Sequence, residues 1–116
     1  MDWQNLMRRL APLRTRWDLA VLANLGGSDA PVRPADLIKA INEQSGDGQI
    51  SWKVMEDRLR RLQASGYVAR REVLHAPRET HYWLLPRGHR LKRALTLLDA
   101  WYDEQDPGTS GDAPSG

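Results

Sequence analysis

Residues 50–88 constrain the fold of this chain more than any other segment. The segment begins with a serine suited to cap a helix and with apolar residues at helical spacing, namely Ser51, Met55, Leu59 and Leu62. Gly66 then ends the helical pattern after Ser65. Two alternating runs follow at residues 67–73 and 80–85, with Pro77 in the turn between them. The segment therefore predicts a helix followed directly by a β-hairpin.

The same part of the chain is strongly basic. Residues 50–93 contain eleven Lys or Arg and four Asp or Glu, whereas residues 1–49 contain six of each kind. Residues 94–116 contain five acids and no Lys or Arg. A formal net charge of only +2 thus combines a basic middle with an acidic end. Such clustering is typical of a surface that binds phosphates.

Length and composition limit the class of protein. A chain of 116 residues with 41% hydrophobic content fits one domain with a modest core. No apolar run approaches the ~20 residues of a membrane helix, and residues 1–13 lack a secretory apolar core, so we expect a cytoplasmic protein. Cysteine is absent, which excludes disulfides, thiolate metal sites and cysteine nucleophiles.

Two apolar stripes lie in the first part of the chain. The first predicts a short amphipathic helix over residues 1–12, which packs either on its own domain or on a second subunit; its apolar residues are Trp3, Leu6, Met7 and Leu10. The second predicts a core helix over about residues 13–25, ended by Gly26 and Gly27. Near that end, the amide of Asn24 is expected to reach a carbonyl of the last turn.

The remaining elements follow from prolines and spacing. Val32 is expected to form a one- or two-residue strand beside the hairpin, and Pro34 to begin a helix that runs to about Gln44. Residues 86–88 are expected to turn the chain into a long last helix, whose apolar residues repeat at three and four: Leu91, Ala94, Leu95, Leu98, Trp101 and Tyr102. Residues 105–116 are rich in Gly, Pro, Ser and Asp and are expected to be disordered, so the domain spans residues 13–104.

The order helix, helix, helix, hairpin, helix predicts a mainly α (α+β) fold, the winged helix-turn-helix. It would have an N-terminal helix, a two- or three-stranded β wing and a long C-terminal helix. Four motifs stand in order within residues 12–104: RWDL at 16–19, ISWKVMEDRLRRL at 50–62, GYV at 66–68 and YWLLPRG at 82–88. With these motifs the chain resembles the HxlR-type transcriptional regulators of bacteria, although Leu85 stands where that family has Thr. The family's thiol sensors have cysteines. Because this chain has none, the resemblance does not imply regulation through a thiol.

The resemblance implies that double-stranded DNA is the partner and that residues 51–65 form the recognition helix. Side chains near the N-terminus of such a helix reach base edges in the major groove, so the reading candidates are Ser51, Trp52, Lys53, Glu56 and Asp57. Lys53 and Arg60 are expected to hold phosphate rather than bases. Trp52 lies at the edge of the core face, where packing competes with DNA contact.

Two acids on the exposed face have two interpretations. A carboxylate of Glu56 or Asp57 can accept a hydrogen bond from the N4 amine of cytosine. Alternatively, each acid forms a solvated pair four residues along the helix, Glu56 with Arg60 and Asp57 with Arg61.

The predicted hairpin supplies further DNA-binding candidates at or near its tip: Arg70, Arg71, His75, Arg78 and His81. A basic wing lies along the DNA backbone or in the minor groove, where it adds affinity with little sequence information. Arg78 is the foremost candidate because it follows Pro77 at the tip.

The sequence contains no recognisable catalytic or metal-binding pattern. The spacing of His75, His81 and His89 fits no compact set of ligands, and no Ser-His-Asp elbow, HExxH run or Gly-rich cofactor loop occurs. We therefore expect no cofactor, no metal and no enzymatic activity.

Both ends of the chain carry more apolar surface than one small domain readily buries, namely Trp3, Leu6, Met7, Leu10, Leu95, Leu98, Trp101 and Tyr102. HxlR-like proteins pair through their terminal helices, so the resemblance implies a homodimer on a pseudo-palindromic site, and we expect a repressor that acts by occlusion. Two alternatives stay open. One is a winged-helix module that binds an acidic protein, and the other is a sensor with a small-molecule effector beside Trp3, Trp17 or Trp101.

Overall fold

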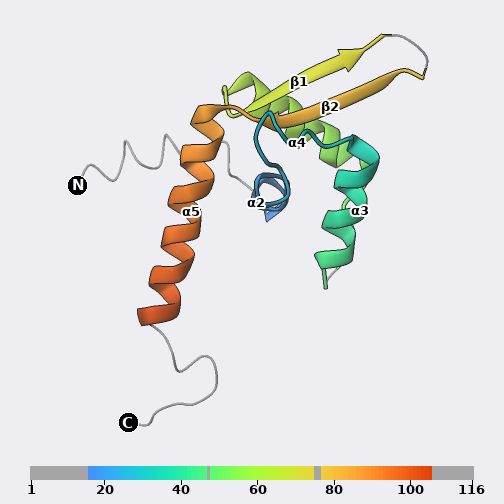
Figure 1. Cartoon of the computed structure of the whole chain (residues 1–116). Helices are drawn as coiled ribbons and strands as arrows, with labels where there is room; N and C mark the ends of the chain where they lie inside the picture. Colours follow the sequence, from blue (N-terminus) through green and yellow to red (C-terminus); the bar gives the residue numbers. More distant parts are fainter. Residues whose placement is uncertain (1–15, 47, 75–76, 106–116) are drawn as a thin grey trace.

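The computed structural model describes residues 16–46, 48–74 and 77–105. Its elements in chain order are α2 (Arg16–Ala23), α3 (Pro34–Gln44), α4 (Trp52–Ala64), β1 (Val68–Val73), β2 (Glu79–Leu84) and α5 (Pro86–Gln105) (Figure 1). This order confirms the predicted winged helix-turn-helix fold. The helix predicted over residues 1–12 lies outside the described residues. So do residues 106–116 of the predicted tail, while Gln105 belongs to α5.

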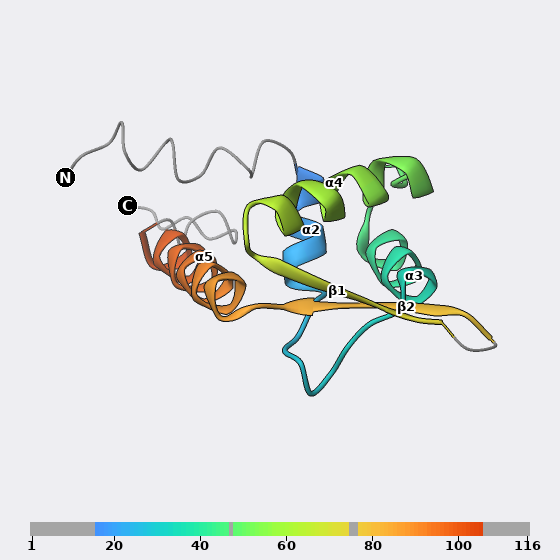
Figure 2. The ribbon, with the colours of Figure 1, turned by 90° about the horizontal axis from the view of Figure 1, so that it is seen from above.

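The helices α2, α3 and α4 lie together on one side of the hairpin, and α5 leaves the base of the hairpin in another direction (Figure 2). The core between them is formed by buried residues from every element except α5: Val21, Leu22, Leu25, Leu37, Ile41, Ile50, Met55, Leu59, Leu62, Tyr67, Val68, Tyr82 and Leu84. Leu91 and Leu95 of α5 pack against this core from outside.

The core helix α2 ends at Ala23, two residues earlier than predicted. Just beyond it, the side-chain amide of Asn24 donates a 2.8 Å hydrogen bond to the carbonyl of Ala20, as the sequence predicted. The Nζ of Lys92 on α5 donates to the carbonyls of Ala23 and Leu25, at 3.2 and 2.9 Å. The two bonds from Lys92 give partners to carbonyls at and just beyond the end of α2, where a helix leaves such groups without intrahelical donors.

The segment just before α3 pairs with the hairpin. The backbone N–H and carbonyl of Val32 both bond Tyr82, each at 2.9 Å, which confirms the expected short strand. Pro34 then occupies the first turn of α3, where its missing N–H removes no helical hydrogen bond.

The predicted recognition helix α4 forms as expected. The hydroxyl of Ser51 accepts a hydrogen bond from the backbone N–H of Val54 at 3.2 Å, so Ser51 caps the helix. Met55, Leu59 and Leu62 are buried. Gly66 follows the helix with φ +82°, a left-handed conformation that glycine adopts without a steric penalty.

The hairpin is an antiparallel pair whose register runs from Val68 opposite Leu84 to Val73 opposite Glu79. Val68, Tyr82 and Leu84 face the core, as predicted, whereas Trp83 lies on the other face and is half-buried. Tyr67 was predicted to start the first strand, but its N–H bonds the carbonyl of Leu62 at 3.0 Å and so completes the end of α4.

The long helix α5 begins at Pro86, so the predicted turn at residues 86–88 is wrong: these residues form the first turn of the helix. Proline is favoured at the first position of a helix because its φ is already helical. A Cβ on Gly88 would collide with the carbonyl of Tyr67, so glycine allows α5 to start against the end of α4. Among the described helices, none has both the length and the apolar composition required to span a bilayer.

Candidate nucleic-acid interface

One face of α4 is directed away from the core, as its spacing predicted. Its exposed side chains are Trp52, Lys53, Glu56, Asp57 and Arg60. Ser51 is exposed just before the helix. Since the opposite face is buried, the first turns of α4 present all five predicted base-reading candidates to solvent.

The acids on this face form neither of the two ion pairs that the sequence suggested. Arg60 pairs with Asp57, three residues earlier, at 3.0 Å, rather than with Glu56. The predicted pair of Asp57 with Arg61 is wrong because Arg61 lies on the side of α4 that faces α2. The Asp57–Arg60 pair is solvent-exposed, and such pairs contribute little to stability.

Arg61 instead pairs with Asp18 of α2, and Nη2 lies 2.7 Å from Oδ2. Asp18 is the one buried charged residue of the described chain, with an exposed fraction of 0%. Burial of a carboxylate is costly unless a cation and hydrogen bonds compensate it. This pair was not predicted from the sequence, although an acid within the apolar stripe of a core helix indicates a buried partner.

A groove of about 520 Å³ lies between the start of α3, the start of α4 and the wing. Its lining residues are Arg33, Pro34, Ala35, Trp52, Pro77, Arg78, Glu79 and Thr80. Two predicted DNA-binding residues, Trp52 and Arg78, therefore lie on one surface. Trp52 is 45% exposed, so nearly half of its surface is open to solvent.

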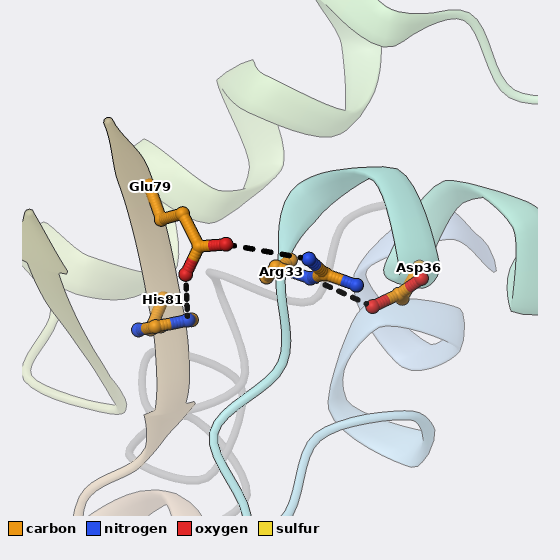
Figure 3. Close-up of polar contacts among 4 residues, drawn as sticks. All are labelled: Arg33, Asp36, Glu79 and His81. Carbon is orange, nitrogen blue, oxygen red and sulfur yellow. Dashed lines mark hydrogen bonds and ion pairs between the residues drawn. The ribbon is translucent and has the colours of Figure 1, made fainter. Parts of the chain in front are cut away.

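The groove also contains Arg33, which sequence analysis missed. Its Nε lies 3.2 Å from Asp36 Oδ2, and its Nη1 lies 3.4 Å from Glu79 Oε1 (Figure 3). His81 Nε2 approaches the other oxygen of Glu79 at 3.4 Å. The two carboxylates, Asp36 foremost, raise the pKa of Arg33 above its ordinary value. Arg33 therefore links the start of α3 to the wing as a permanent cation.

The basic residues of the hairpin are spread along it rather than gathered at its tip. The register places Arg70 opposite Tyr82 and Arg71 opposite His81, midway along the ladder. Arg71 and Arg78 are exposed, whereas His81 is half-buried. His75 lies outside the described residues. The prediction that the whole set lies near the tip is therefore wrong for Arg70, Arg71 and His81.

Arg70 points toward the recognition helix. Its Nε donates to the hydroxyl of Tyr82 at 3.3 Å, and this bond is the main cause of a raised pKa for Arg70. A small cavity of about 200 Å³ separates β1 from α4, and it is lined by Glu56, Arg60, Gln63, Arg70 and Tyr82. Two cations from different elements, Arg60 and Arg70, thus border the same space.

Two open grooves flank α2, away from this surface. One of about 400 Å³ lies between α2 and α5 and includes Leu19, Leu95 and Leu98. Another of about 580 Å³ lies beside Trp17. Leu98 and Trp101 of α5 are 47% and 49% exposed. The side chain of Tyr102 and the residues Trp3, Leu6, Met7 and Leu10 lie outside the described part.

The arrangement of an exposed helix beside a basic wing agrees with a match to a known family. The family model described as HxlR-like helix-turn-helix matches residues 13–109. The chain belongs to the HxlR-like helix-turn-helix family. The predicted resemblance is confirmed, and this HxlR-like protein is a DNA-binding transcriptional regulator rather than an enzyme.

Several solved structures share the fold of this HxlR-like protein. A MarR-family transcriptional regulator from Enterococcus faecalis V583 superposes with a TM-score of 0.78 at 24% identity, covering 95% of this chain and 93% of that chain. The reduced form of the regulator YodB from B. subtilis gives 0.69 at 24% identity, with coverage of 86% and 90%. The regulator ytfH from Salmonella typhimurium gives 0.66 at 23% identity, with coverage of 89% and 84%. No curated protein matches the chain.

Proposed function

We propose that this HxlR-like protein binds an operator in double-stranded DNA as a homodimer and represses transcription by occluding the promoter. The observation that supports this proposal is the exposed N-terminal half of α4 beside a groove that holds Arg33 and Arg78. A helix of this kind enters the major groove, while the wing follows the backbone.

The contacts on α4 suggest a division of roles. Asp57 is engaged by Arg60, whereas Glu56 forms no ion pair with any described residue. Glu56 is therefore the better candidate to accept a hydrogen bond from cytosine N4. Lys53 lies one residue into the helix and is exposed, so it reaches phosphate or the acceptor edge of guanine.

Other cations on this surface are proposed to bind the phosphate backbone of DNA. Arg60 and Arg70 border one cavity, and Arg71 and Arg78 are exposed along the wing. His81, and His75 outside the described residues, belong to the same proposed surface. Contacts of this kind fix the position of the protein on the duplex and add affinity that falls with salt.

The proposal of a homodimer is based on the exposed apolar residues of α5. Leu98 and Trp101 are about half exposed, and Leu98 also lines the groove beside α2. Exposed apolar patches of this kind mark interaction sites. The segment that carries Trp3, Leu6, Met7 and Leu10 precedes α2 directly and is proposed to join the same interface, together with Leu95 and Tyr102.

A gel shift against the DNA upstream of the protein's own gene tests the function. The proposal predicts saturable binding that is tighter than binding to random DNA, with two half-sites related by a two-fold axis. Equal affinity for both duplexes would contradict operator recognition at this promoter. No saturable binding at ~50–100 mM salt would favour the alternative of a protein-interaction module.

A small-molecule effector is a second candidate because an open groove of about 580 Å³ lies beside Trp17. Its lining includes Leu19, Ala20 and Ile41, which are apolar, and Gln44, which is polar. A compound that binds there is expected to change tryptophan fluorescence and to release DNA. Compounds that change the fluorescence without altering DNA affinity would argue against an effector role.

A further inference from the structure

We propose that the groove between α3, α4 and the wing is the binding site for a backbone phosphate of the DNA strand beside the recognition helix, and that Arg33 is its principal cation. This inference rests on the proposed function, because its ligand is duplex DNA. Arg33 was not among the residues that the sequence indicated for DNA binding.

The position of the groove defines the ligand. It is bounded by Trp52 at the start of α4 and by Pro77 and Arg78 on the wing. A winged helix places its recognition helix in the major groove and its wing on the adjacent backbone, so a sugar-phosphate strand passes between the two. The exposed ring of Trp52 provides an apolar wall for a sugar, and Arg33 and Arg78 provide charge for the phosphate.

The backbone at Arg33 is held in place before any ligand binds. Val32 forms two hydrogen bonds with Tyr82, and Pro34 begins α3 on the other side. The cation is therefore carried by a fixed stretch of chain between a strand and a helix. Fixing a binding residue in advance reduces the entropy lost on association.

The side chain of Arg33 is nevertheless available to a phosphate. It is 53% exposed, and its ion pairs with Asp36 and Glu79 use Nε and Nη1. The guanidinium has further N–H donors, which can bind a phosphate oxygen while the existing contacts rearrange. Exposed ion pairs are weak, so a phosphate can displace Glu79 from Nη1.

Glu79 opposes the same ligand. Its carboxylate lines the groove, contacts Arg33 at 3.4 Å and would lie close to a bound phosphate. Like charges at this range repel, and the repulsion weakens as salt increases. Glu79 therefore attenuates DNA binding, and its neutral analogue is expected to bind DNA more tightly.

The test is titration of the full chain with duplex DNA at several salt concentrations. We expect R33A to raise Kd ~3–10-fold at ~100 mM salt and to reduce the salt slope by about 1, equally for upstream and random duplexes. R33K retains the charge, so it should keep the wild-type slope. E79Q should lower Kd by ~2–5-fold at low salt, and this gain should shrink as salt rises.

The control is R93A, which removes an exposed arginine from α5 and should leave the salt slope unchanged. If R33A binds like wild type while Lys53→Ala weakens binding, the phosphate site is wrong and the regulator function stands. If E79Q leaves Kd unchanged at every salt concentration, the role given to Glu79 is wrong. If the wild-type chain ignores duplex DNA, the proposed function itself fails.

Discussion

Arg61 of α4 donates a 2.7 Å hydrogen bond to the fully buried carboxylate of Asp18 on α2. The two residues are 43 positions apart, and the pair joins the core helix to the last turn of the recognition helix. Because each partner is held by its own helix, the contact helps to fix the angle at which α4 meets the rest of the domain.

Removal of this cation should destabilise the fold. Arg61→Ala removes the cation that pairs with Oδ2 of the buried Asp18 carboxylate, and we expect a loss of about 2–4 kcal/mol in the free energy of unfolding. This is below the range for a fully buried pair because Arg61 is about one-third exposed. Urea denaturation measures this loss in the free energy of unfolding. Arg60→Ala, one residue earlier and exposed, should cost under about 1 kcal/mol; equal losses for the two variants would contradict the role of the pair.

Gly88 should tolerate no side chain. Alanine at this position places Cβ against the carbonyl of Tyr67, so Gly88→Ala must shift the start of α5. We expect a destabilisation of about 1–3 kcal/mol, as for other overpacked sites. Gly46→Ala is the matched control, since its Cβ would meet nothing within 4 Å. Thermal unfolding of the two variants side by side should show a lower Tm only for Gly88→Ala.

Ser51 combines a structural role with a place on the proposed DNA surface, and two substitutions separate them. Ser51→Ala removes the cap of α4 and should cost about 1 kcal/mol. Ser51→Asp keeps a capping oxygen and should preserve stability, but its negative charge would face phosphates and weaken DNA binding. Denaturation and DNA titration of both variants check this. Unchanged DNA affinity in Ser51→Asp would place Ser51 outside the interface.

The proposed dimer should depend on α5. Leu98→Glu introduces a charge into the apolar groove beside α2 and is expected to convert a dimer into a monomer of 13.2 kDa. Sedimentation equilibrium measures the mass. Leu74→Glu changes an even more exposed leucine at the end of the wing and should leave the dimer intact. A wild-type chain that sediments as a monomer at every concentration would rule out the proposed assembly.

Sequence reasoning predicted the features that depend on local pattern. The spacing of Met55, Leu59 and Leu62 identified the buried face of α4, and Ser51 identified its start. The cap at Asn24 followed from one polar residue at the end of an apolar stripe. These features are set by residues within one or two turns of each other, so the sequence displays them directly.

The missed features depend on contacts between distant segments. Arg61 belongs to α4 by pattern, but its partner is Asp18, which no helical spacing relates to it. Arg33 and Glu79 are separated by 46 positions and meet only because Val32 pairs with Tyr82. The start of α5 at Pro86 was missed because Pro-Arg-Gly is typical of turns, and only the close approach to Tyr67 shows why Gly88 fits a helix.

The most direct test of the central claim is the DNA affinity of Lys53→Ala, measured at several salt concentrations against wild type and against Lys39→Ala. Lys39 is an exposed lysine on α3 that lies outside the proposed surface. We predict that wild type and Lys39→Ala bind duplex DNA with the same steep salt dependence, while Lys53→Ala binds ~3–10-fold more weakly with unchanged unfolding. Equal binding by all three proteins, or no binding to duplex DNA at ~50 mM salt, would contradict the claim that α4 reads DNA.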